Sequence, residues 1–146
     1  MKAHHLAAAG LACAALLTAT SPTFAAEPKA LDAALDCSWN GHKFVAPLAE
    51  AGDIDTKPMH VEANSMNAFH TAHPLTAYGF SVYVVLGYQE NDPLFQHGDG
   101  TQIDQWGYGV VVRGSKSSVE AKVRAAGSTA TVKAAFPFLT AIVCTP

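Results

Sequence analysis

The alternation of apolar and polar positions predicts most of the regular structure in the C-terminal half of the chain. Two segments are rich in β-branched and aromatic side chains, and two shorter ones alternate apolar and polar residues. A stretch with four acids, Pro93 and two glycines separates the first pair and is typical of a long polar loop. The predicted strands are 80–88, 106–113, 129–135 and 139–145, and the loop is 89–105.

Helical periodicity is weaker and indicates two helices. Residues 117–126 begin with a sequence typical of a capping box, Ser117 to Glu120, and carry an apolar stripe that ends before Gly127. Residues 27–36 have apolar side chains at helical spacing, which predicts a short helix ending near Cys37. The pattern over 42–51 is ambiguous because Pro47 would lie inside a helix. A short strand at 60–62 is also left open.

Together these elements predict an α+β domain. We expect a mainly antiparallel sheet of four to five strands, with one packed helix (117–126) and a short N-terminal helix. No internal repeat divides the chain, and 146 residues suit a single core.

The N-terminus resembles a secretory signal peptide. Lys2 precedes an uncharged run from Leu6 to Leu17, and small residues follow up to Ala25. The run is too short to span a bilayer as a helix. We therefore expect residues 1–25 to be cleaved, a mature domain of residues 26–146, and a periplasmic or secreted location without membrane contact after cleavage.

Cleavage would leave two cysteines, Cys37 and Cys144. An even number of cysteines in an exported chain predicts a disulfide, and no CxxC or CxxH spacing points to a metal pair. Such a bridge would join the two ends of the domain.

Charge is unevenly distributed along the mature chain. Residues 26–112 carry eleven acids and three bases, whereas residues 113–146 carry one acid and five bases. The basic part lacks aromatic residues interleaved with its cations, so nucleic-acid binding is disfavoured. The acids gather in the predicted 89–104 loop.

The histidines offer a weak candidate for metal binding. His70 and His73 would share one face of a helical turn, and His60 or His97 would add a third ligand. Pro74 opposes helical geometry at His73, and no dedicated zinc spacing is present. The acids and glycines of 98–104 lack the regular Asp spacing of a calcium loop. No cofactor is expected, and histidines in solvated loops are the simpler interpretation.

No sequence feature names a catalytic nucleophile. The serines lie in no GxSxG elbow, and cysteines in a disulfide are not available as thiolates. The chain is therefore not expected to be an enzyme, although a small secreted hydrolase or a metal-binding protein using His60, His70 and His73 remains the alternative.

The long loop is the preferred binding site. Its acids surround Leu94 and Phe95, a composition found in recognition surfaces. The competing interpretation is that Leu94, Phe95 and the segment 65–69 form core beneath the loop. The first interpretation predicts a non-catalytic, exported binding protein, such as a periplasmic inhibitor or immunity-type protein, that engages a basic enzyme. Its candidate contact residues are Glu90, Asp92, Leu94, Phe95, Asp99 and Asp104.

Overall fold

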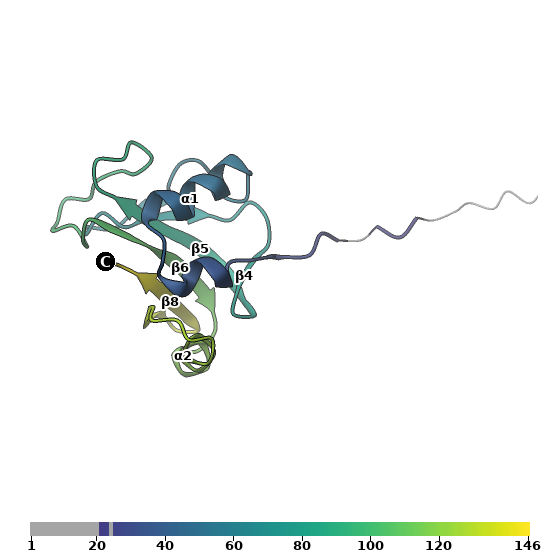
Figure 1. Ribbon diagram of the computed structural model, residues 1–146. Coiled ribbons are helices and arrows are strands. Elements are labelled where there is room, and N and C mark those ends of the chain that lie inside the picture. Colours follow the sequence, from purple (N-terminus) through teal and green to yellow (C-terminus); the bar gives the residue numbers. More distant parts are fainter. Residues whose placement is uncertain (1–20, 24) are drawn as a thin grey trace, which may run out of the picture.

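The computed structural model describes residues 21–23 and 25–146. Most of the predicted signal peptide lies outside the described residues. The fold is α+β, as predicted, with a mixed sheet of eight strands and two α-helices in the described part of the chain (Figure 1). The strands are β1 (Lys29–Ala30), β2 (His60–Val61), β3 (Asn67–His70), β4 (Leu75–Ala77), β5 (Phe80–Gln89), β6 (Trp106–Arg113), β7 (Thr131–Phe136) and β8 (Leu139–Cys144). The helices are the 3₁₀ helix η1 (Asp32–Asp36), α1 (Gly41–Glu50) and α2 (Lys116–Ala125).

The sheet is built around β5, β6 and β8, which pair antiparallel in the order β5-β6-β8. β7 forms a hairpin with β8, and β3 and β4 both pair with the free edge of β5. Only the short β1–β4 pair is parallel among the described strands. The four predicted strands are confirmed, but the expected count of four to five is wrong. The additional strands have two to four residues, too few to show a periodic pattern.

The two faces of the sheet are covered differently. Tyr108 faces α1, where its ring lies 4.8 Å from that of Phe44. Its strand neighbours Val110 and Val112 are fully buried on the same face. On the opposite face, Val111 lines an open groove of about 460 Å³ to which no helix contributes a residue. The helices therefore cover one face of the sheet, and the core lies between them and that face.

The ambiguous segment after residue 41 forms α1. The Asn40 side chain caps the helix by accepting a hydrogen bond from the Lys43 amide, 2.9 Å away. Pro47 lies inside the helix, where it removes one backbone donor. The helix forms because its apolar stripe is buried against β5 and β6, and this burial outweighs the local cost of the proline. The stripe consists of Phe44, Val45 and Leu48.

α2 confirms the second predicted helix, but its start differs by one residue. The cap is Ser115, whose hydroxyl accepts from the Ser118 amide, and not Ser117. Val119 and Val123 are fully buried, and Gly127 takes the left-handed conformation expected after a helix, with φ of 78°. The predicted apolar stripe is thus correct at Val119 and Val123, whereas its third member, Ala126, follows the helix and is exposed.

The predicted N-terminal helix over 27–36 is only partly correct. Residues 29–30 form β1 instead, because the Leu31 amide donates to the Thr76 carbonyl and the Lys29 amide donates to the Pro74 carbonyl. Only 32–36 are helical, as the 3₁₀ turn η1. η1 ends at Cys37, which forms the predicted disulfide with Cys144 at the end of β8.

The disulfide joins two cysteines that are 107 positions apart in the sequence. Closing a loop of this size restricts the unfolded chain by about 4–5 kcal/mol in the chain-entropy model, and removal of native disulfides typically costs about 2–5 kcal/mol. We expect Cys144→Ser to lower the free energy of unfolding by that amount without abolishing the fold, because the β5–β6 core does not depend on the bridge. Denaturant unfolding monitored by circular dichroism measures the change. The Cys37→Ser/Cys144→Ser double variant is the control and should match the single variant, whereas an unchanged midpoint would contradict the stabilising role of the bridge.

Candidate functional site

The candidate site is the acidic loop, residues 90–105, which joins β5 to β6 at one end of the sheet (Figure 1). The sequence placed its start at Gln89, but Gln89 is the last residue of β5 and pairs with Trp106. The Glu90 amide donates to the Gln105 carbonyl at 2.9 Å, which closes the base of the loop. The loop is therefore long, but its ends are adjacent and fixed by the sheet.

Two buried polar side chains hold the middle of the loop. The Asn67 side chain donates to the Gln96 carbonyl at 2.8 Å and accepts from the Gln96 amide at 2.9 Å. The Ser65 hydroxyl accepts from the Gly98 amide at 3.0 Å. Asn67 and Ser65 are almost completely buried, so these bonds satisfy polar groups that water does not reach. The loop and its support depend on each other.

Backbone contacts fix the second half of the loop. Gly100 and Ile103 donate their amides to the carbonyls of Ala63 and Asn64, each at 2.8 Å. A side chain at Gly98 would overlap the carbonyl oxygen of Glu62, so this close approach requires glycine. The glycines of the loop therefore serve its packing against the β2–β3 turn.

Phe95 does not have the exposed position that an aromatic anchor requires. Its side chain is 5% exposed, and its ring lies 6.3 Å from those of Phe69 and Tyr88. The expectation of a surface anchor at Phe95 is corrected, because the loop folds back and buries this ring. Leu94 is half-buried beside it. The competing interpretation, core beneath a loop, describes Phe95 and also the buried segment 65–69.

Asp92 is engaged within the protein. One of its carboxylate oxygens lies 2.5 Å from Nδ1 of His42 on α1, and the other accepts from the Leu94 amide at 2.9 Å. This side chain ties the start of the acidic loop to α1. The Asp92 carboxylate therefore helps to fix the conformation of the loop and is only partly available to a partner.

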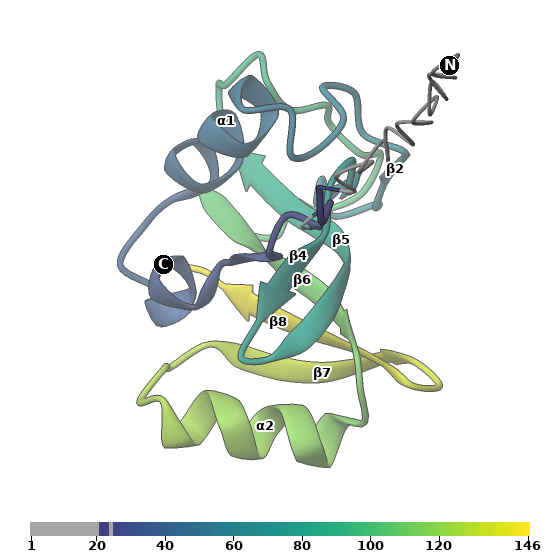
Figure 2. The same ribbon diagram turned by 90° about the vertical axis from the view of Figure 1, so that its right-hand side faces the viewer.

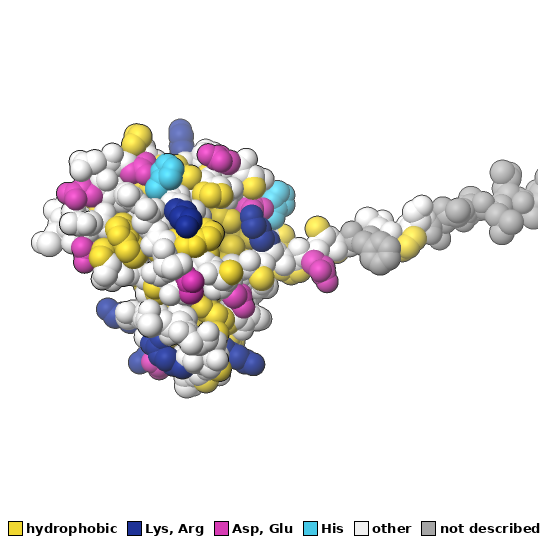
Figure 3. All heavy atoms as spheres, viewed as in Figure 1, with side chains coloured by type: hydrophobic (Ala, Val, Ile, Leu, Met, Phe, Trp, Pro, Cys, Tyr) yellow, Lys and Arg dark blue, Asp and Glu magenta, His cyan; other side chains and the backbone are white. Residues whose placement is uncertain are grey.

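Glu90, Asp99 and Asp104 are the acids that the loop exposes. Within the described residues, no Lys, Arg or His nitrogen lies within ion-pair distance of any of the three. Figure 3 shows acidic side chains along the edge formed by the acidic loop and several lysines and arginines in the part over α2. The loop therefore presents unpaired negative charge on a fixed backbone.

The candidate metal-binding histidines are only partly brought together. His70 and His73 line one open cavity with Tyr83 and Arg113, whereas His60 does not line it. Carboxylates accompany the histidines as pairs: the nitrogen–oxygen distances are 3.3 Å for His60 to Glu62, 3.9 Å for His70 to Asp55 and 3.7 Å for His73 to Asp53. Residues 21–23 and 25–146 contain no group of three or more His, Cys, Asp or Glu side chains arranged to hold a metal ion. Residues 98–104, considered above as a calcium loop, belong to this range and contribute to no such group.

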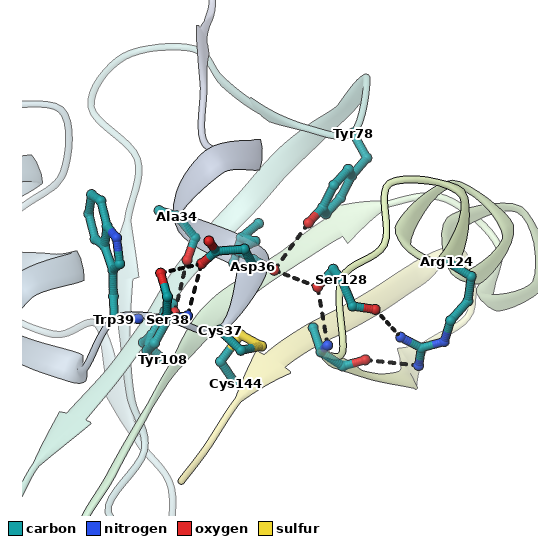
Figure 4. The surroundings of a disulfide bond; sticks show 12 residues. Ala34, Asp36, Cys37, Ser38, Trp39, Tyr78, Tyr108, Arg124, Ser128 and Cys144 are labelled. Carbon is teal, nitrogen blue, oxygen red and sulfur yellow. Dashed lines mark hydrogen bonds between the residues drawn. A yellow bond between two sulfur atoms is a disulfide. The ribbon is translucent and has the colours of Figure 1, made fainter.

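A cluster of hydroxyl groups beside the disulfide was not predicted (Figure 4). The Tyr108 hydroxyl donates to the Ala34 carbonyl at 2.9 Å and accepts from the Trp39 amide at 3.1 Å. The hydroxyls of Tyr78 and Ser128 both donate to the Leu35 carbonyl. The sequence carried no signal for this cluster, because the three hydroxyls come from separate segments and are far from η1 along the chain.

Burial and hydrogen bonding shift the pKa values of several groups around these networks. Desolvation raises the pKa of Tyr78, Tyr88 and Tyr108 above the usual value of 10. Tyr88 also donates to the Gln102 side chain at 2.9 Å, which anchors the acidic loop. The hydroxyl and amide of Ser38 lower the pKa of the exposed Asp36 carboxyl. These shifts fit structural roles for the tyrosines.

No protein-family model, curated protein or solved structure matches this chain. None of the described helices is long and apolar enough to cross a membrane. The geometry of the described residues is therefore the basis for any functional proposal.

Removal of the Tyr108 hydroxyl tests the cluster at η1. Tyr108→Phe leaves the buried Ala34 carbonyl and Trp39 amide without this partner, so we expect the free energy of unfolding to fall by about 1–3 kcal/mol. Tyr83→Phe is the matched control, because Tyr83 is 39% exposed and its hydroxyl makes no hydrogen bond within the described residues; its effect should stay within about 0.5 kcal/mol. Urea unfolding measures the free energy of unfolding of both variants, and an equal decrease in the two would contradict the stabilising role of the cluster.

The raised tyrosine pKa values predict lower stability in alkali. Above about pH 10 the unfolded chain releases phenolic protons that Tyr78, Tyr88 and Tyr108 retain in the folded protein, so the free energy of unfolding should fall as the pH rises further. Denaturant unfolding between pH 7 and 11 measures this slope, with a thiol assay to verify the disulfide. Tyr108→Phe should show a smaller slope than the wild type, and an equal slope would contradict the assignment to Tyr108.

Proposed function

We propose that this is an exported, non-catalytic binding protein whose acidic loop engages a basic partner. The observation that carries the proposal is the combination of a loop fixed by buried hydrogen bonds with three exposed, unpaired acids, Glu90, Asp99 and Asp104. A periplasmic inhibitor or immunity-type protein that binds a basic enzyme fits this surface. The disulfide is compatible with export.

The rigid support of the loop favours binding. Association costs free energy when a mobile segment must become ordered, and a loop already held by Asn67, Ser65 and the β2–β3 turn avoids most of this cost. Unpaired acids on such a loop attract a basic surface over a distance and orient it during encounter. The acidic loop therefore suits rapid, salt-sensitive association.

Phe95 contributes to this function only indirectly. It is part of the core that supports the loop, so its replacement is expected to affect folding and binding together. The direct contacts are assigned to Glu90, Asp99 and Asp104, with half-buried Leu94 at the margin. Asp92 contributes by holding the loop to His42.

A second candidate is a small hydrolase or metal protein, favoured by the cavity of about 390 Å³ that His70 and His73 share with Tyr83 and Arg113. Zinc titration of the purified protein by calorimetry tests the metal-binding form of this candidate. Binding that is lost in His70→Ala/His73→Ala would support it, and it would leave the acidic-loop proposal to its own test.

Charge reversal in the acidic loop tests the proposed function. We expect Asp99→Lys/Asp104→Lys to reduce the association rate with a partner captured from cell extract by at least tenfold at low salt, and to flatten the salt dependence of that rate. Surface plasmon resonance measures both quantities. The fold should be unchanged, because both side chains are exposed.

Glu27→Lys is the control for this experiment, because it reverses an exposed acid in the N-terminal segment outside the loop. It should bind like the wild type. The proposal is contradicted if no protein is retained by the wild type and lost with the loop variant, or if the control and the loop variant bind equally.

A further inference from the structure

The tip of the β7–β8 hairpin exposes two phenylalanines. Phe136 is 74% and Phe138 is 83% exposed, the highest values among the large hydrophobic side chains of the described residues. Phe138 has a left-handed backbone, with φ of 61°, which is uncommon for an aromatic residue. Figure 2 shows the hairpin projecting at the lower right, away from α1 and the C-terminus. Exposed aromatic rings on a projecting tip indicate a binding surface.

Cations surround the base of this tip. The Gly114 amide donates to the Phe138 carbonyl at 2.8 Å, which places the turn after β6 against the hairpin. Lys116 lines one shallow cavity together with Phe136 and Phe138. Arg113 pairs in register with Leu139, directly after the tip, and its guanidinium lies 4.9 Å from the centre of the Tyr83 ring. Aromatic rings with adjacent cations therefore share this end of the sheet.

The tip of the hairpin, after Lys133 of β7, carries no charge that would oppose transfer into an apolar medium. From Ala134 to the last residue of the chain there is no Asp, Glu, Lys or Arg. Glu120 is the only acid among residues 113–146, where five bases occur. The tip can thus leave water without burying a charged side chain, and the surrounding segment is positive.

The tip and the acidic loop lie at opposite ends of the sheet. Gln89 pairs with Trp106 at the loop end of β6, and Arg113 pairs with Leu139 at the hairpin end. The eight residues of β6 separate the two ends by roughly 25 Å at the usual rise of a strand. The molecule is thus polarised, with exposed negative charge at one end and aromatic and positive groups at the other.

We infer that the hairpin tip binds the surface of a membrane that contains anionic phospholipids. Phe136 and Phe138 enter the boundary between headgroups and acyl chains, and Lys116 and Arg113 contact lipid phosphates. Aromatic residues with adjacent cations are typical of this interface, and an anionic surface attracts the positive end and repels the acidic loop. This inference stands apart from the proposed function and departs from the sequence-based expectation of no membrane contact.

A lipid surface explains the tip better than a protein pocket does. Each ring is more than two-thirds exposed, and the cavity that the two rings line with Lys116 is open and shallow, so it encloses little of a protein side chain. A bilayer surface needs no such complementarity, because apolar rings and cations enter it independently. The charge polarity also sets one orientation, with the acidic loop directed away from the membrane.

Vesicle binding of the exported chain tests the inference. Sedimentation with vesicles of 30% phosphatidylglycerol and 70% phosphatidylcholine should show binding that is much weaker with phosphatidylcholine alone. Phe136→Ser/Phe138→Ser should lower the partition coefficient at least about tenfold, because the variant lacks the two aromatic side chains that the wild type buries in the membrane. Lys116→Glu should lower it about fivefold or more on anionic vesicles only.

Two surface variants outside the hairpin serve as matched controls. Met59→Ser removes an apolar side chain that is 55% exposed, and Lys57→Glu reverses an exposed cation in the same segment. Both should partition like the wild type. Any vesicle binding caused by a retained N-terminal leader would be equal in all variants and would not follow the hairpin changes.

A tryptophan at the tip gives a direct readout of insertion. Compared with the wild type, Phe138→Trp should add fluorescence that shifts to shorter wavelength with anionic vesicles and is quenched by brominated lipid chains. Unchanged partitioning of the Phe136→Ser/Phe138→Ser variant, or absence of binding to anionic vesicles, would overturn the inference. A dimer of the wild type that is lost in this variant, measured by sedimentation equilibrium without vesicle binding, would assign the tip to self-association instead.

Discussion

The contacts at the end of η1 hold separate segments of this domain together. The η1 carbonyl groups at Ala34 and Leu35 lie in the core, where an unpaired acceptor would cost about 1–3 kcal/mol. Hydroxyls from the β4–β5 turn, β6 and the segment after α2 satisfy them, and the disulfide at Cys37 links the same turn to β8. One short helical turn thus joins four separate parts of the chain near the C-terminal end of β8. Because Tyr108 and Ser128 are buried and Tyr78 is half-buried, the arrangement is specific in geometry as well as stabilising.

The acidic loop is organised by the same physical rule. Asn67 and Ser65 are polar residues in the core, and their hydrogen-bonding groups are satisfied by the backbone of the loop. Phe95 then completes the apolar side of this support, against Phe69 and Tyr88. The loop and the core beneath it therefore form one unit, and the exposed acids are carried on a backbone that this unit holds in place. This coupling makes the acidic surface a permanent feature of the fold.

The uneven charge of the sequence becomes a spatial polarity in the folded molecule. Adjacent strands could have mixed the acidic and basic halves of the chain. Instead, the β5–β6 connection places acids at one end of the sheet, while the β7–β8 hairpin lies at the other end, next to Arg113 and Lys116. The two proposed binding surfaces are far enough apart to act at once. A protein attached to a membrane by its hairpin would present its acidic loop to partners in solution.

The local pattern of side chains was enough to predict the strands at β5 and β6, the helix at α2 and the pairing of Cys37 with Cys144. In each case the signal lies within one segment, or in the count of cysteines. α1 could not be assigned, because Pro47 disfavours a helix locally and only burial of Phe44 and Leu48 against the sheet outweighs it. The sequence likewise located the acidic loop but could not separate its exposed acids from Phe95, whose burial depends on support from residues about thirty positions earlier. It left residues 136–138 between two predicted strands, whereas the exposure of both rings follows from the absence of covering residues in the described structure. Long-range contacts decide which polar groups are paired and which apolar groups leave water, and a local pattern does not contain them.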